Sequence, residues 1–462
     1  MSASQATGNG SIPCDLLVTA AGVVTVDPND TILRPGAIAV SGEKIVAVGT
    51  PEQLAQTYAP KKRIDAPACW IFPGLINTHN HLWQTMLKGL GDDMGLIDWI
   101  QTLLAPTMPQ IDDEAAYLGS MLGALESARS GCTTMLDFMH HFPKLSLYDE
   151  TIRAWDEVGG SLIMARTIRD SVRTSAVAGY PADLTLDEQL AHVEALLERL
   201  GRDKVWIAPG TVWGMSVDGL KRVRTMADEK GLLITIHMNE VAFDSEESVR
   251  RTGLRSIPLL ASIGFLNEDV LHAQGVYNDD EDIALLAKHR CAVSYNPISN
   301  MYLGSGIPPV VKMRDAGVRL SLATDGAASN NSQDMIEALK FGALLQKVAH
   351  ADSTIVSAPE ILRMATVGGA DAIHRKDVGY LAPDMRADFF LFDPRSAKST
   401  PMHDPISTLV YTGSEHNVVT TVAAGRIVLE DGKITGVNEA DLLAQAQEAA
   451  ERLAVRSGIK QG

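Results

Sequence analysis

Short apolar runs, separated by residues that favour turns, occupy both ends of the chain. Runs of this length and composition, broken by segments such as Asp27-Pro28-Asn29-Asp30, are typical of β-strands. The strand-like runs lie at 15–26, 37–40, 44–48, 387–392 and 418–430. We therefore predict one small β domain, a β-sandwich that residues 1–72 and 378–462 form together, with a helix near the C-terminus.

Between the two ends, strand-like and helix-like segments alternate. One unit is clear, because Thr185 and Glu188 can form a capping box and apolar residues recur at helical spacing from Leu190 to Leu200 before the next strand-like run. The strand-like runs of this region are the one before His79 and those at 133–136, 162–165, 205–208, 232–236, 270–271, 292–295 and 319–323. Eight such units close into a barrel more readily than they form an open sheet. We predict an α/β fold, with a (β/α)8 TIM-like barrel over residues 73–377.

The charge balance limits the partners of the chain. Its 57 acidic and 40 basic residues give a formal net charge of -17, which repels the phosphates of nucleic acids and anionic membrane surfaces. The four cysteines are far apart and show no CxxC pattern, which excludes a disulfide framework and a zinc ribbon. The polar N-terminus and the absence of an apolar run of roughly 18 residues predict a cytoplasmic protein without a membrane segment. We also expect a barrel of this size to form a homo-oligomer.

Histidines and one aspartate follow separate predicted strands. His79 and His81 follow the first strand of the barrel, two residues apart and so on one face, and His237 and Asp325 follow later strands. In a TIM-like barrel the carboxyl ends of all strands meet at one face. A lone histidine there is more often a packing residue, but recurrence at several strands favours a metal site. Three imidazoles and one carboxylate suit zinc or ferrous iron and leave a position open for water.

Four motifs carry these and related residues. They are Pro73-Gly74-Leu75-Ile76-Asn77-Thr78-His79-Asn80-His81, His237-Met238-Asn239-Glu240, His272 and Thr324-Asp325-Gly326-Ala327-Ala328-Ser329-Asn330. Together they resemble the motifs of the amidohydrolase superfamily. The closer resemblance is to its branch of cytosine, guanine and S-adenosylhomocysteine deaminases and s-triazine hydrolases. It covers nearly the whole chain and is far more specific for the family than for the substrate.

The resemblance implies that His79, His81, His237 and Asp325 bind one divalent metal ion per chain. Zinc is the preferred ion, with iron or cobalt as alternatives. Branches with two metals usually carry a carboxylated lysine at the end of the fourth strand, where this chain has Pro209-Gly210. A single-metal site is therefore expected.

The resemblance also implies the catalytic roles. Asp325 and His272 would orient and deprotonate the attacking water, whose pKa a bound metal can lower from 15.7 to about 7. Glu240 would carry the proton to a ring nitrogen and then to the leaving amine. The alternatives are that Glu240 is a surface carboxylate at a helix start and that His272 is a packing residue.

Substrate-binding candidates lie beside these motifs. The resemblance to guanine-type deaminases and triazine hydrolases implies that Gln84 can contact a polar edge of the substrate, while Trp83 can either stack on a planar ring or belong to the core. Asn300, in the loop after the seventh strand, Ser329 and Arg169 complete the set.

One departure from the family pattern bears on the substrate. S-adenosylhomocysteine deaminases usually show a histidine in an Ala-Pro-His segment, where this chain has Ala208-Pro209-Gly210. The departure weakens the expectation of a nucleoside substrate. Arg166 and the pair His140 and His141 can line the same pocket or form structural contacts, and the sequence leaves their roles open.

Three functions fit these observations. The first is hydrolytic deamination of a small nitrogen heterocycle such as a purine, pyrimidine, pterin or s-triazine. The second uses the same site to displace chloride, an alkylamine or a thiol, or to cleave a urea or carbamate. The third is a non-catalytic oligomer of the barrel fold, which the intact set of candidate metal ligands disfavours.

Overall fold

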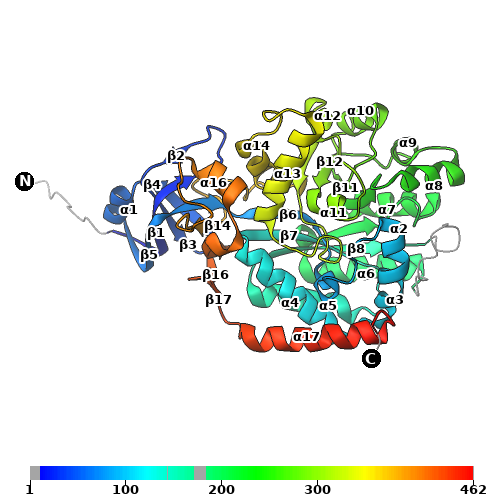
Figure 1. The fold of residues 1–462 in the computed structure, drawn as a ribbon, viewed down its shortest axis with the longest axis horizontal. Helices are drawn as coiled ribbons and strands as arrows, with labels where there is room; N and C mark the ends of the chain where they lie inside the picture. Colours follow the sequence, from blue (N-terminus) through cyan, green and yellow to red (C-terminus); the bar gives the residue numbers. More distant parts are fainter. Residues whose placement is uncertain (1–10, 143, 171–183, 461–462) are drawn as a thin grey trace, which may run out of the picture.

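An eight-stranded parallel sheet forms the centre of the protein in the computed structural model, which describes residues 11–142, 144–170 and 184–460 (Figure 1). Its strands are hydrogen-bonded in chain order. They are β6 (Leu75–Asn80), β7 (Cys132–Met139), β8 (Ser161–Ile168), β9 (Val205–Pro209), β10 (Ile234–Met238), β11 (Val270–Gln274), β12 (Ala292–Tyr295) and β13 (Arg319–Leu322). After β13, the N–H of Asp325 donates to the carbonyl of His79 in β6 at 3.1 Å, so the first and last strands meet. The predicted TIM-like barrel is confirmed.

Helices surround this barrel (Figure 1). In the unit predicted at 185–208, Thr185 and Glu188 form the capping box of α6, and β9 follows. The helices within the described residues are α1 (Pro51–Thr57), α2 (Leu96–Trp99), α3 (Ala105–Thr107), α4 (Asp113–Arg129), α5 (Ser146–Val158), α6 (Leu186–Leu200), α7 (Val217–Lys230), α8 (Ala242–Thr252), α9 (Ser256–Ser262), α10 (Asp280–Lys288), α11 (Pro297–Tyr302), α12 (Val310–Asp315), α13 (Met335–His350), α14 (Ala358–Met364), α15 (Val367–Ala372), α16 (Pro405–Thr412) and α17 (Glu439–Arg456). None of them is long and apolar enough to cross a membrane.

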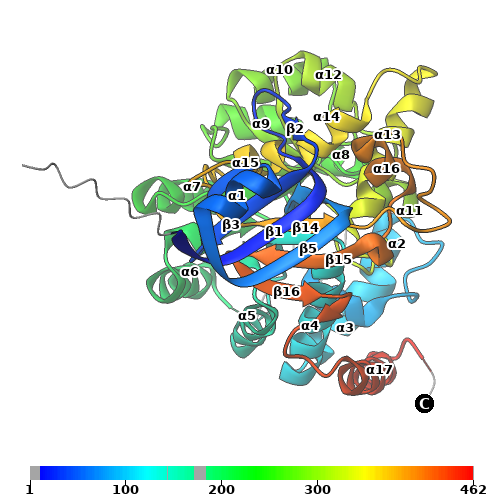
Figure 2. The ribbon, with the colours of Figure 1, turned by 90° about the vertical axis from the view of Figure 1, so that its left-hand side faces the viewer.

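Strands from both ends of the chain form a second, mixed sheet beside the barrel (Figure 2). In spatial order they are β17 (Lys433–Ile434), β16 (Arg426–Glu430), β15 (Val418–Ala423), β14 (Phe389–Phe392), β5 (Tyr58–Pro73), β1 (Ile12–Val24), β3 (Gly36–Ser41) and β4 (Lys44–Gly49), with β2 (Ile32–Leu33) paired to β1. Phe390 of β14 lies opposite Phe72 of β5, and their stacked rings are 5.6 Å apart. The two ends of the chain therefore fold together, as one continuous nine-stranded sheet within the described residues.

Apolar side chains fill the barrel beneath its carboxyl end. They come from six different strands, and successive residues of a strand point to opposite faces, so their neighbours in sequence point outward to the helices. The inward-facing cluster includes Ile76, Leu136, Ile163, Trp206, Leu271 and Ala292. This packed interior leaves the carboxyl end as the place where polar side chains can gather.

Candidate metal and catalytic site

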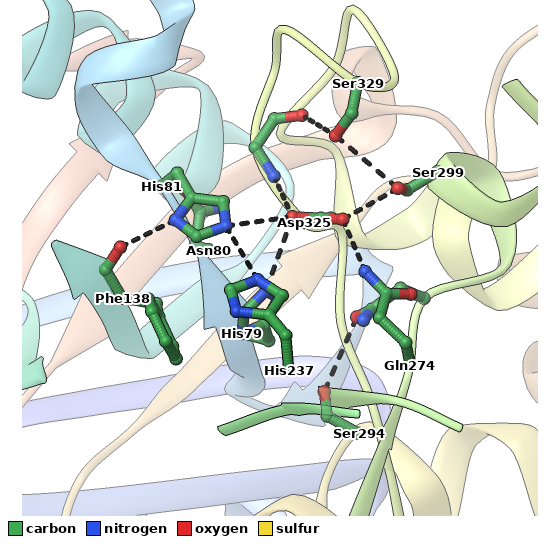
Figure 3. A network of polar contacts seen from close by, with 12 residues as sticks. His79, Asn80, His81, Phe138, His237, Gln274, Ser294, Ser299, Asp325 and Ser329 are labelled. Atoms are coloured by element: carbon green, nitrogen blue, oxygen red, sulfur yellow. Dashed lines mark hydrogen bonds and ion pairs between the residues drawn. The ribbon is translucent and has the colours of Figure 1, made fainter. Parts of the chain in front are cut away.

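Three histidines meet at the carboxyl end of the barrel. His79 lies in β6, His81 follows that strand directly, and His237 lies in β10. One ring nitrogen of each histidine lies within 4.8 Å of those of the other two, and the Nε2 atoms of His81 and His237 are 3.3 Å apart. Figure 3 shows the three rings around one point. Imidazole nitrogens that converge in this way can share a metal ion.

Backbone carbonyls orient two of the rings. Nδ1 of His81 donates to the carbonyl of Phe138 at 2.6 Å, and Nδ1 of His237 donates to that of Gly210 at 3.0 Å. The Nε2 lone pairs are thereby left facing the cluster, as metal-binding histidines require. Burial lowers the pKa of both rings to about 4, so both are neutral at neutral pH and able to act as ligands.

Asp325 completes the cluster. Its Oδ1 lies 3.4 Å from Nε2 of His79 and 3.4 Å from Nε2 of His81. Burial by itself would raise the pKa of this carboxyl group, but its contact with His79 and the charges of the neighbouring rings lower the pKa below its ordinary value. Both ring nitrogens of His79 are buried without a hydrogen bond among the described residues. The four side chains therefore fit a divalent ion such as zinc, which pairs with imidazole and carboxylate ligands.

Glu240 stands beside this cluster, just after β10. Its N–H donates to Asp244 Oδ2 at 2.7 Å, and Asp244 Oδ1 accepts from Trp213 Nε1 at 2.8 Å, so the turn that carries Glu240 is held in place. Burial, together with the charges of Asp325 and Asp244, raises the pKa of Glu240 well above that of an exposed glutamate. A buried carboxyl group with a raised pKa is suited to take up and release a proton.

An open cavity lies over these residues. Gln84 and Arg169, two of the candidate substrate-binding residues, line it. The amide oxygen and nitrogen of Gln84 are both buried and have no hydrogen-bond partner in the part of the chain that the structure describes. The apolar part of the wall includes Leu96, Trp99, Ile100, Leu104 and Leu303. The cavity can thus take a ligand that has both a polar edge and an apolar part.

Trp83 does not lie in the cavity wall, where stacking on a substrate ring would require it, but in the core. It is fully buried, and its Nε1 donates to Nδ1 of His140 at 3.1 Å. His140 and His141 themselves line the cavity. Trp99 and Trp213 are the tryptophans that face it.

Asn300 and Ser329 also lie outside the cavity wall. Asn300 Nδ2 donates to the amide oxygen of Gln274 at 2.6 Å, and Ser329 Oγ donates to a backbone carbonyl of its own turn at 2.9 Å. Both side chains are buried, and neither lines the cavity. Arg166 is buried with its guanidinium carbon 5.1 Å from the ring of Tyr148, which points to a structural contact.

His272 is not brought to the cluster. It lies within β11, and because Leu271 belongs to the inward-facing cluster, His272 points outward to the helices. Its ring nitrogens are buried without a hydrogen bond among the described residues. Gln274, two residues further on, reaches Asp325 instead, with Nε2 2.8 Å from Oδ2. The sequence had given Gln274 no role, and its only signal was its position at a strand end before a glycine.

A (β/α)8 barrel with a histidine cluster on β6 and β10 and an aspartate after β13 defines a metal-dependent hydrolase of the amidohydrolase type. The model of the amidohydrolase family matches residues 70–428, so the chain belongs to the amidohydrolase family. The predicted family is therefore confirmed. So is the predicted class of enzyme, one that acts on carbon-nitrogen bonds other than peptide bonds.

Relatives match over nearly the whole chain. A 5-methylthioadenosine/S-adenosylhomocysteine deaminase of Syntrophus aciditrophicus is 33% identical over 452 residues, which cover 97% of this chain and 99% of the relative. A 5'-deoxyadenosine deaminase of Methanosarcina barkeri is 35% identical over 454 residues, covering 96% and 99%. The zinc-bound structure of an adenosine deaminase from Xanthomonas campestris has a TM-score of 0.89 at 29% identity and covers 96% of this chain and 100% of that one. An atrazine chlorohydrolase of Arthrobacter aurescens shares the fold, with a TM-score of 0.86 at 24% identity, covering 94% and 100%.

Proposed function

We propose that this protein is a zinc-dependent deaminase that hydrolyses the exocyclic amine of an adenine-type nucleoside. The observation that carries the proposal is that Glu240 and Gln84 line the same cavity as His81, His237 and Asp325. The relatives support the substrate class, because two of them are deaminases of adenosine derivatives by name and the zinc-bound neighbour is an adenosine deaminase. Atrazine chlorohydrolase supports the fold alone.

The chain's own residues supply most of the chemistry. A divalent ion bound by His79, His81, His237 and Asp325 would make an attacking water more acidic. Glu240 is placed to carry the two protons of that water in turn, the first to a ring nitrogen and the second, from the added hydroxyl, to the departing amine. Oxygen adds to the ring carbon, the carbon-nitrogen bond breaks, and ammonia leaves.

The cavity wall supplies the recognition of the substrate. The amide of Gln84 offers one donor and one acceptor, which complement a ring edge that carries both. The guanidinium carbon of Arg169 lies 5.9 Å from the centre of the Trp213 ring, and both residues line the cavity. Gly210 has no side chain at its place in the wall, so we propose that Trp213 and Arg169, rather than a histidine at that position, contact the nucleoside.

Ammonia release from zinc-loaded protein tests this function. We expect ammonia from adenosine, 5'-deoxyadenosine or 5-methylthioadenosine, with the change in ultraviolet absorption that accompanies conversion of adenine to hypoxanthine. Chloride or alkylamine release from a triazine, without ammonia from any nucleoside, would instead support the alternative displacement reaction. No reaction with either group of substrates would reject both.

Removal of the Gln84 amide should weaken use of the substrate without loss of metal. Gln84→Met keeps the side-chain volume, and we expect kcat/KM for the best nucleoside to fall roughly 10- to 100-fold, the usual cost of unpaired polar groups in a binding site. Zinc content should match that of the wild type, because Gln84 is not a candidate ligand. Steady-state kinetics and metal analysis check both points, and an unchanged kcat/KM would remove Gln84 from the binding site.

A further inference from the structure

Gln274 is the last residue of β11, and its side chain contacts Asp325 of the candidate metal site (Figure 3). Its Nε2 donates to Asp325 Oδ2 at 2.8 Å, and its Oε1 accepts from Asn300 Nδ2 at 2.6 Å. The side chain is fully buried, so both hydrogen bonds are shielded from water. Gln274 and Asp325 have backbone φ angles of 85° and 67°, in the left-handed region that residues other than glycine rarely adopt. The unusual backbone is thus found at the two residues whose side chains meet.

The two oxygens of Asp325 have different surroundings. Oδ2 accepts a second hydrogen bond, from Ser299 Oγ at 2.7 Å, so both of its lone pairs are engaged. Oδ1 accepts from the N–H of Gly326 at 2.7 Å and faces the Nε2 atoms of His79 and His81. One oxygen is therefore held by the protein, and the other keeps one lone pair for a metal ion.

We propose that Gln274 is a positioning residue, which with Ser299 holds Asp325 so that Oδ1 serves as a metal ligand and no lone pair is left for a proton. The proton of the attacking water then goes to Glu240, which accepts one long hydrogen bond, from Ser305 at 3.4 Å. Glu240 gives that proton to a ring nitrogen and then carries the second proton of the water to the amine as the carbon-nitrogen bond breaks, so that ammonia leaves. The proton route rests on the proposed function, whereas the positioning of Asp325 does not depend on the substrate.

Gln274→Met tests the positioning, because methionine keeps the volume and removes both hydrogen bonds. We expect the variant to bind Co²⁺ about 10- to 100-fold more weakly than the wild type, the usual effect of losing a partner of a metal ligand. The visible absorption spectrum of the Co²⁺ protein should also change. In the Co²⁺-saturated variant kcat should fall while KM changes less than about twofold, since Gln274 is not among the described residues that line the cavity.

Gln346→Met is the matched control. Gln346 is an equally buried glutamine, on α13, whose Nε2 donates to the hydroxyl of Tyr295 at 3.2 Å. It should lose stability as any buried glutamine would, yet bind Co²⁺ as the wild type does. Folded Gln274→Met protein with wild-type Co²⁺ affinity and spectrum would overturn the inference.

Ser299→Ala removes the other donor to Asp325 Oδ2 and keeps the test open if Gln274→Met does not fold. We expect weaker Co²⁺ binding here as well, at a melting temperature close to that of the wild type. If folded Ser299→Ala protein bound Co²⁺ as tightly as the wild type, the proposal that donors to Oδ2 position Asp325 would be contradicted.

An exchange of the two groups tests the contact between them. Asp325→Asn alone can place its new amide N–H opposite the Nε2–H of Gln274, where neither group can accept, and this variant should bind Co²⁺ poorly. Adding Gln274→Glu turns the hydrogen bond around, because the new carboxylate can accept from the asparagine while Oδ1 stays directed at the histidines. We expect the double variant to bind Co²⁺ at least about tenfold more tightly than Asp325→Asn, the size of coupling common between contacting residues. No gain would overturn the inference.

These results separate the inference from the proposed function. Wild-type protein that binds Co²⁺ but releases no ammonia from nucleosides would reject the function, while the Co²⁺ comparison would still decide the role of Gln274. Wild-type deamination together with unchanged Co²⁺ binding in Gln274→Met would reject only the role of Gln274.

Discussion

His237→Ala should give a folded barrel that holds no zinc and has no measurable deaminase activity. His237 supplies one of three imidazoles within 4.8 Å of one another, and its Nε2 is oriented by the carbonyl of Gly210. Without it, two histidines and Asp325 remain, one side chain fewer than the four that would hold the ion in the intact site. The fold should survive because His237 lies at the end of β10 and lines an open cavity.

Zinc content and thermal unfolding measure this result. Free zinc at a hundredfold excess over its dissociation constant should stabilise the wild type by about 2.7 kcal/mol and leave the variant unchanged. His416→Ala is the control, since the side chain of His416 is 87% exposed in a part of the chain remote in sequence from the four candidate ligands. A His237→Ala protein that keeps one zinc per chain would show that the ion is bound elsewhere.

The alternation of strand-like and helix-like segments was enough to predict the barrel, because parallel strands that are buried on both faces appear in the sequence as continuous apolar runs. It also placed His79, His81, His237 and Asp325 together, because all strands of such a barrel end at the same face. These predictions depend on the position of a residue along the chain, to within a residue or two.

The direction in which a side chain points at a strand end requires finer knowledge. The sequence indicated a strand at 270–271, which would make His272 the residue after it; the strand in fact continues to Gln274 and turns His272 outward. The φ of 85° at Gln274, whose side chain contacts Asp325, cannot be predicted from the residue types around it. The sequence left Trp83 between a stacking role and the core for a related reason. A 3-10 helix, η1 (Leu82–Leu87), begins directly after His81 and directs Trp83 into the core.

Glu240→Gln should keep zinc and lose roughly 10² to 10⁴ in kcat, the contribution typical of a positioned general acid and base. The amide has nearly the same shape as the carboxyl group and can still accept the hydrogen bond from Ser305, so the cavity should keep its form. It cannot take up a proton from water and pass it to the leaving amine. KM should change little, because the loss falls on a step after binding.

Asp244→Asn separates proton transfer from the support of the turn that carries Glu240. Asp244 holds that turn by accepting from the N–H of Glu240 at 2.7 Å, and its charge helps to raise the pKa of Glu240. This variant should therefore lower kcat only as far as Glu240 is displaced and its pKa falls. Metal analysis of all three proteins should give equal zinc, and single-turnover measurements of ammonia should show the deficit of Glu240→Gln in the chemical step. Near wild-type kcat in zinc-loaded Glu240→Gln would mean that another group carries the proton. Because both oxygens of Asp325 are engaged, His140 in the cavity wall would be the next residue to replace.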